Sequence, residues 1–206
     1  MSKQVLIMPT PPGTQGVYQV AGHTGAMSTV GAQDILLAFR MTNPSYFAVL
    51  DYLSVSVGAV TEVTTDVIGG LQLSFVSDFF SNYQGGRSLL GVANTHENKL
   101  KSDFPVSALS SIRIAETIAL DLPLVSVPEV SALPLAEVMY GTGPATDIGL
   151  MVLPQTELFR RDTNSFPLVI STDEGFVVQA SLNSPASGTL RFSFTLRWIE
   201  MTKQVF

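Results

Sequence analysis

The segment from Leu190 to Trp198 alternates strictly between large apolar and polar residues, and this pattern constrains the fold more than any other. The apolar members are Leu190, Phe192, Phe194, Leu196 and Trp198. The polar members are Arg191, Ser193, Thr195 and Arg197. Successive side chains of a β-strand point to opposite faces of its sheet. The segment therefore predicts a strand with an aromatic core face and a polar outer face, in which each large buried side chain contributes about 1.5–3 kcal/mol.

The same period of two recurs along the chain. It appears in residues 35–41, 71–75 and 176–182, and residues 46–57 are rich in aromatic and β-branched side chains. We expect residues 35–75 to form a three-strand meander. We also expect a hairpin through residues 183–188 to join the last two strands. Shorter strands are predicted at residues 111–115, 117–122 and 167–170.

The remaining segments favour long connections over helices. Helical periodicity does not extend over 12 or more residues anywhere in the sequence, although short helical turns are expected around residues 76–83 and 131–139. The long connections at residues 81–109 and 123–147 are typical of Greek-key crossovers. The pattern predicts an all-β fold, a β-sandwich of the jelly-roll or Greek-key kind.

Residues 1–33 differ from the rest in composition. Residues 9–16 hold three prolines and two glycines, and residues 21–33 are rich in Gly, Ala, Ser and Thr. Such a segment has little apolar surface to offset chain entropy. We expect an extended N-terminal arm over residues 1–33 and a single β-sandwich domain over residues 34–206. Residues 4–8 could form a short strand, and Val17, Tyr18 and Val20 favour partial docking of the arm on a neighbour.

The charge of the chain points to protein partners. Only 14% of residues are charged, against about 25% in ordinary soluble domains, and the net charge is −6. This sign argues against nucleic acid as a partner. The longest stretch without charged residues, 4–33, is broken by prolines and glycines, so we expect no membrane-spanning helix. Obligate interfaces are depleted in charge, which predicts a homo-oligomer.

The sequence offers little for catalysis. There is no cysteine, and the first residues lack the features of a signal peptide. His23 and His96 lie in predicted loops without the spacing of a zinc site, and no GxSxG motif occurs. Asp173 and Glu174 form a turn, and Arg160 and Arg161 are interpreted as surface charges.

We therefore predict no catalytic, cofactor-binding or metal-binding residues, no cofactor and no enzymatic activity. The densest remaining basic group, Lys99 with Lys101, is interpreted as solvated loop charge. Tyrosines in loops, such as Tyr83, are the candidates for stacking on a sugar. The five tyrosines are Tyr18, Tyr46, Tyr52, Tyr83 and Tyr140.

Three stretches carry a resemblance to a known family. One is DILLAFRMT at residues 34–42 followed by AVLDYLSV at residues 48–55. The second is NKLK at residues 98–101 with SIRIA at residues 111–115. The third is the ending, FPLVI at 166–170, DEGFVV at 173–178, GTLRF at 188–192 and RWIE at 197–200. In these stretches the chain resembles a family of tailed-bacteriophage and prophage virion proteins. Residues 125–134 depart from that pattern.

The resemblance implies a virion component, such as a capsid decoration (cement) protein or another head-associated protein that oligomerises and stabilises the shell. Its partners would be further copies of itself, in a symmetric oligomer such as a trimer, and the major capsid protein or other virion proteins. It would be located in the virion after assembly in the host cytoplasm. Two alternatives remain at this point: a receptor- or glycan-binding domain of a tail fibre or baseplate, and a β-sandwich hydrolase.

Overall fold

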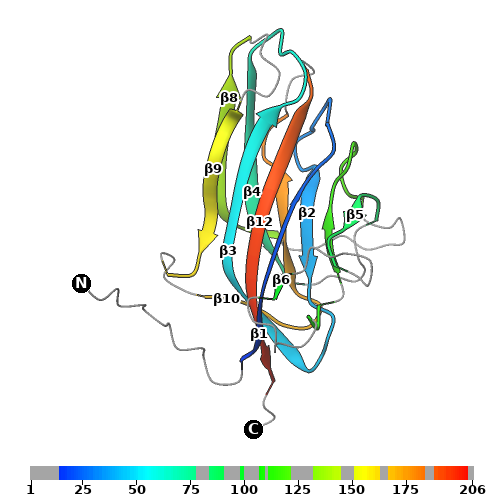
Figure 1. Cartoon of the computed structure of the whole chain (residues 1–206), viewed down its shortest axis with the longest axis vertical. Helices are drawn as coiled ribbons and strands as arrows, with labels where there is room; N and C mark the ends of the chain where they lie inside the picture. The colour runs from blue at the N-terminus through cyan, green and yellow to red at the C-terminus, as the bar shows by residue number, and fades with distance from the viewer. Residues whose placement is uncertain are drawn as a thin grey trace, which may run out of the picture.

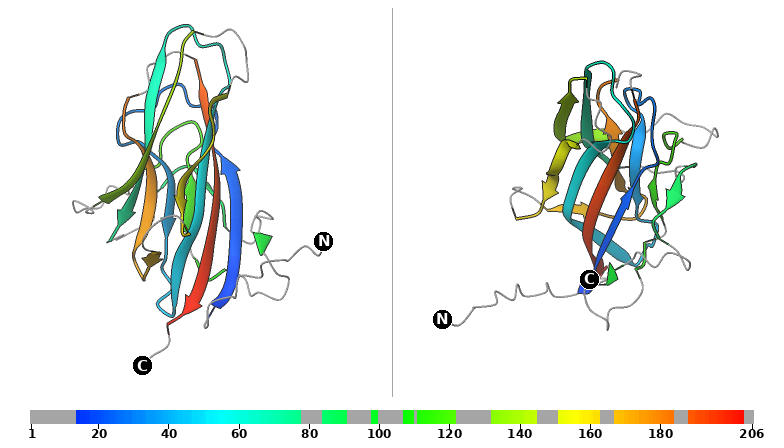
Figure 2. Two further views of the ribbon diagram at one scale, coloured as in Figure 1. Left: turned by 90° about the vertical axis from the view of Figure 1, so that its left-hand side faces the viewer. Right: turned by 45° about the horizontal axis from the view of Figure 1, so that its top comes forward.

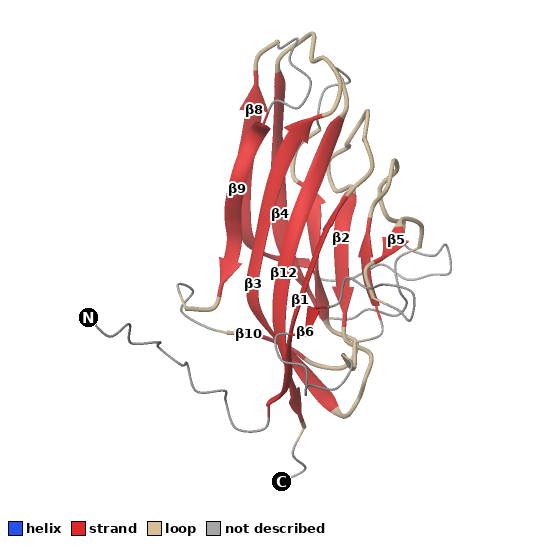
Figure 3. Cartoon of the chain, viewed as in Figure 1, coloured by secondary structure: helices blue, strands red, loops and turns tan. Residues whose placement is uncertain are grey.

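The structure is a computed structural model that describes most of the chain as strands and their connections (Figure 1). The described residues are 14–77, 84–90, 98–99, 107–109, 111–121, 132–144, 151–162, 167–183 and 188–203. Every regular element within these ranges is a β-strand, as Figure 3 shows. The prediction of an all-β chain is confirmed.

Two antiparallel sheets pack face to face as two layers (Figure 2). The first sheet has the order β10-β3-β12-β1-β6, and β9 lies beside β3 on the same side as β10. Its strands are β1 (Thr14–His23), β3 (Tyr46–Ala59), β6 (Asn98–Lys99), β9 (Met151–Arg160), β10 (Leu168–Ile170) and β12 (Leu190–Thr202). The second sheet has the order β5-β7-β2-β11-β4-β8. Its strands are β2 (Ile35–Arg40), β4 (Val67–Val76), β5 (Arg87–Ser88), β7 (Ser111–Ile114), β8 (Ala132–Thr142) and β11 (Gly175–Ala180).

The strand pairs are nested, so that early strands pair with late ones. β1 pairs with β12 and β2 pairs with β11. Further in, β3 pairs with β10, and β4 pairs with β8. Because the members of successive pairs lie in alternate sheets, the chain passes repeatedly from one layer to the other.

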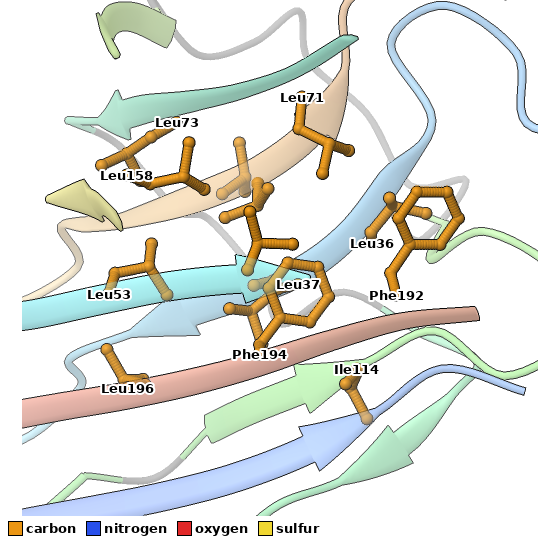
Figure 4. Close-up of a cluster of buried hydrophobic side chains, with 14 of the residues drawn as sticks. Leu36, Leu37, Leu53, Leu71, Leu73, Ile114, Leu158, Phe192, Phe194 and Leu196 are labelled. Carbon is orange, nitrogen blue, oxygen red and sulfur yellow. The ribbon is translucent and has the colours of Figure 1, made fainter. Parts of the chain in front are cut away.

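The core between the layers is built around aromatic side chains. Trp198 of β12 stacks on Tyr18 at 5.5 Å between ring centroids and meets Phe39 of β2 edge-on at 5.9 Å. Phe39 in turn stacks on Phe176 of β11 at 4.7 Å. These contacts link both sheets, and aliphatic side chains from both sheets pack together farther along the core (Figure 4). The alternation predicted for β12 is confirmed, because its five large apolar side chains are all buried.

The structure differs from the expected boundary at residue 34. Residues 14–23 of the expected arm are strand β1, which pairs with β12 from Thr14 to His23. Tyr18 and Val20 are buried in the core, and Met27 bridges to Leu190. Tyr18 and Val20 lie two residues apart on one face of the strand, a pattern too short to stand out among glycines. Residues 1–13 of the expected arm lie outside the described residues.

Three further expectations are corrected. Residues 35–75 do not form a meander, because β2 and β4 lie in the second sheet and β3 lies in the first. β11 and β12 likewise belong to different sheets and form no hairpin. Residues 132–142 form the long strand β8, where a helical turn and a long connection were expected. Alternation assigns side chains to faces but does not determine which strands pair, and this explains the first two errors.

Candidate functional site

The residues that the sequence singled out are scattered over the sandwich. His23 is the last residue of β1, where a loop was expected, and its Nδ1 lies 2.7 Å from the carbonyl oxygen of Thr24. His96 lies outside the described residues. Asp173 has a φ of 64° in the expected turn and pairs with Arg40 at 2.8 Å. Glu174 accepts a hydrogen bond from the backbone of Ser171. Within the described ranges, His, Asp and Glu form no group of three that could hold a metal ion.

The tyrosines are mainly packing residues. Tyr18 and Tyr140 are buried in the core, and Tyr46 and Tyr52 are half-buried. Tyr83, the loop candidate for sugar binding, lies outside the described residues, as do residues 100–101 of the predicted basic loop. Lys99 belongs to the short strand β6. The tyrosines that the structure describes therefore give no exposed stacking platform.

A cluster of ion pairs covers one end of the outer face of the first sheet. A β-bulge opposite Arg197 and Trp198 leaves Asp51 outside the ladder, so that Asp51 and Tyr52 both point outward. Asp51 pairs with Arg197 at 2.5 Å and with Arg161 at 2.9 Å.

The guanidinium groups of Arg160 and Arg197 lie 5.7 Å and 5.8 Å from the centre of the Tyr52 ring. Arg160 also pairs with Glu157 and, at 3.7 Å, with Asp162. Each arginine in this cluster has a carboxylate partner, although Arg160 belongs to strand β9 and not to a loop. The cluster therefore holds β3, β9 and β12 together and offers no unpaired charge to a ligand.

Strand β8 forms a free edge of the second sheet. It pairs with β4 on one side, and among the described strands none pairs with it on the other side. Leu133 and Met139 of this strand are 61% and 50% exposed, and Leu135 is exposed as well. Glu137 is the strand's single charged residue. Long edge strands with apolar side chains and little charge are sites where another chain can pair.

The apolar character extends to the neighbours of β8. Ile68 of β4 is 60% exposed and pairs in register with Gly141, while Met139 pairs with Gly70. Ile68 and Met139 are thus diagonal neighbours on one face of the sheet. We call Ile68, Leu133, Leu135 and Met139 the apolar edge. β9, the edge strand of the first sheet, lies against β8 on this side of the sandwich (Figure 1).

A small hollow lies at the other end of the outer face of the first sheet. It has a volume of about 240 Å³ and is open to solvent. The side chains and backbone that matter for its chemistry belong to Ser56, Gly58, Val60, Met151, Arg191 and Ser193. We call this site the outer hollow. It combines one guanidinium group and two hydroxyl groups with an apolar wall.

Sequence reasoning missed both the apolar edge and the outer hollow. β8 contains Pro134 and Glu137, and β9 contains Pro154. These residues interrupt the alternation, so neither segment was predicted as a strand. The signal for the edge was low charge in a stretch that could still alternate, as at Val138 and Tyr140. The signal for the hollow was Gly58, which directly follows the predicted strand at residues 46–57 and lies within β3. A glycine inside a strand often marks a close approach of a ligand.

The described part of the chain contains no helix that is long and apolar enough to cross a membrane. Comparison with family models, with curated proteins and with solved structures yields no match.

Proposed function

We propose that this protein is a non-enzymatic structural component of a bacteriophage virion, a capsid decoration or other head-associated protein that self-associates and stabilises the shell. The observation that carries the proposal is the apolar edge on the free strand β8. Long edge strands with exposed apolar side chains and little charge are places where another chain can pair. Only 14% of the residues in the whole chain are charged. Few charged side chains are therefore available to oppose association with another protein.

The proposal includes a jelly-roll topology. When β5, β6, β7 and β9 are set aside, the nested pairs leave four strands in each sheet, in the orders β1-β12-β3-β10 and β2-β11-β4-β8. A jelly roll consists of two four-stranded sheets of this kind, and the fold is common in viral capsid and lectin domains. The strand order supports this topology, and the fold is compatible with both assembly and sugar binding.

Self-association would work through the edge and through the N-terminal segment. Residues 1–13 precede β1 and include the apolar run of residues 5–8. We propose that this segment contacts a neighbouring copy or the major capsid protein. Copies bound to the assembled shell would stabilise it by mass action, because they bind the assembled form in preference to the separated parts.

The test is the oligomeric state of the purified protein. Gel filtration with light scattering should give a mass that is a multiple of 22.1 kDa at micromolar concentration. Cryo-electron microscopy of phage particles should then locate the chain on the capsid. A monomer that stays monomeric up to millimolar concentration would contradict self-association, and a particle without the chain would contradict the virion role.

A second candidate function is receptor or glycan binding, as part of a tail fibre or baseplate. The outer hollow favours it, because the polar side chains of the hollow have no partner among the described residues. Binding of a sugar that is abolished by a change in the hollow, in a protein that remains monomeric, would support this function over the first.

A further inference from the structure

Gly58, which carries no side chain, lies in the lining of the outer hollow. In the register of the first sheet, Gly58 pairs with Arg191 of β12 on one side and with Met151 of β9 on the other. Neighbouring strands lie about 4.8 Å apart, so Arg191 and Met151 are attached about 10 Å apart, on either side of a residue without a side chain. The relative positions of Gly58, Arg191 and Met151 are therefore set by three adjacent strands and not by a loop.

Two hydroxyl groups lie beside Gly58, at the next pair of positions on the same face of the sheet. Ser56 pairs with Ser193 directly across β3 and β12. Residues two apart on a strand share a face, so both hydroxyls stand on the face that carries Arg191. Neither serine side chain has a hydrogen-bond partner among the described residues. His23 of β1 pairs with Ser193 and continues this row of paired residues.

Arg191 differs from the other arginines. The side chains of Arg40, Arg160, Arg161 and Arg197 pair with carboxylates. Arg87 and Arg113 donate to backbone carbonyl oxygens. In the described part of the chain, Arg191 alone has neither kind of partner. Among the residues that the structure describes, no carboxylate lines the hollow that Arg191 borders.

We propose that the outer hollow binds a carboxylate-bearing sugar unit. The guanidinium fork of Arg191 matches the two oxygens of a carboxylate. The hydroxyls of Ser56 and Ser193 can donate to or accept from sugar hydroxyls. Met151, which is 63% exposed, and Val60 provide the apolar wall against which a ring can pack.

The size of the hollow limits the ligand. Sites for drug-sized molecules usually measure about 300–1,000 Å³, whereas this hollow measures about 240 Å³. It therefore takes one sugar unit, and its open side allows that unit to belong to a longer glycan. The inference deepens the second candidate function and rests on it, not on self-association.

The experiment uses methyl NMR of the full chain labelled at its seven methionines. Methyl signals remain visible in large assemblies, and the variant Met151→Leu identifies the signal of Met151. Met27 and Met41 are buried and serve as references, and Met139 reports on the apolar edge. The probes are N-acetylneuraminic acid and glucuronic acid, with glucose and acetate as comparisons.

We expect saturable shifts of the Met151 signal with the two acidic sugars, at millimolar concentration, and no shift of Met139. Arg191→Gln should raise the Kd about 10- to 100-fold, the factor for a lost charge-assisted hydrogen bond. Gly58→Val keeps every polar group and adds a side chain to the lining, and it should abolish binding. Arg160→Gln removes the same charge from the other end of the same face and should leave binding unchanged.

Each other outcome overturns the inference. If glucose binds as tightly as the acidic sugars, the guanidinium does not select the ligand. If acetate binds as tightly, the hollow recognises a carboxylate and not a sugar. If Met151 does not shift, or if Gly58→Val binds normally, the ligand does not occupy the hollow. Because light scattering measures self-association separately, these outcomes leave the assembly proposal untouched.

Discussion

Strands β12 and β8 are both long, yet their side chains follow different rules. β12 buries its large apolar residues, from Leu190 to Trp198, and exposes or half-exposes the polar residues between them. β8 buries Tyr140 but leaves Leu133 and Met139 exposed. β12 has a neighbour on each side, β3 and β1, whereas β8 has β4 alone.

The two strands thus differ in whether their large apolar side chains pack within a single copy. The buried side chains of β12 are explained by the fold of a single copy. The exposed apolar side chains of β8 are not explained by the core of that copy, and we propose that another protein covers them. Substitutions in β12 should therefore reduce stability, and substitutions in β8 should reduce association.

The largest effect is expected at the core face of β12. Phe192 is fully buried and meets Tyr140 edge-on at 5.9 Å between ring centroids. Phe192→Ala should lower the free energy of unfolding by about 3–5 kcal/mol, because it removes apolar contacts and leaves a cavity. Urea denaturation followed by fluorescence measures this. Thr195→Ala, on the outer face of the same strand, should cost less than about 1 kcal/mol. Equal losses would contradict the assignment of the two faces.

A smaller loss is expected at the lower end of β12, where the core face carries a carboxylate. Glu200 is 1% exposed and accepts hydrogen bonds from the indole nitrogen of Trp198 at 3.0 Å and the backbone nitrogen of Ala108 at 2.7 Å. It also accepts from the hydroxyl of Ser107.

Glu200→Ala should lower the free energy of unfolding by about 2–3 kcal/mol, because these buried donors lose their acceptor. Glu200→Gln keeps one oxygen acceptor and should lose less. Thermal and urea denaturation of the three proteins compare them, and an alanine variant as stable as the parent would show that the donors reach water.

The apolar edge should respond in association. Met139→Lys should weaken self-association at least about tenfold, because a charge would have to be buried in the interface. Sedimentation velocity over a concentration series measures the change. Ile118→Lys is the matched control, since Ile118 is 73% exposed and lies away from the apolar edge. If both variants associate alike, the edge is not the interface.

The smallest effect is expected among the exposed ion pairs of β9. Arg160 and Asp162 lie 3.7 Å apart, and their side chains are 41% and 58% exposed. Asp162→Asn should change the free energy of unfolding by less than about 1 kcal/mol, and added salt should reduce even that. Urea denaturation at low and high salt measures it. A larger loss would mean that the charged side chains at this edge contribute substantially to the free energy of unfolding.

Much of the fold was predictable where alternation was long. Residues 176–182 and 190–198 showed it plainly, and β11 and β12 lie there. β2 was predicted as a strand with one better-buried and one worse-buried face, but side chains on both of its faces are buried. Alternation follows from the pleat of a single strand, so it can be recognised from the local sequence alone.

The pairing and the candidate sites were not predictable. Tyr18 of β1 packs against Trp198 of the neighbouring strand β12, and Trp198 is far away in the sequence. The outer hollow joins Gly58, Met151 and Arg191 from three strands whose register only the folded sheet reveals. Arg191 could not be distinguished from the six other arginines until their partners were known.

The nested pairing also has a consequence for synthesis. The first described strand, β1, is completed only by β12 near the end of the chain. A ribosome adds about 5–20 residues per second, so 206 residues take roughly 10–40 s. Throughout that interval Tyr18 and Val20 lack their final neighbours, and contacts so distant in sequence form slowly. The nascent chain should therefore depend on chaperones until translation ends.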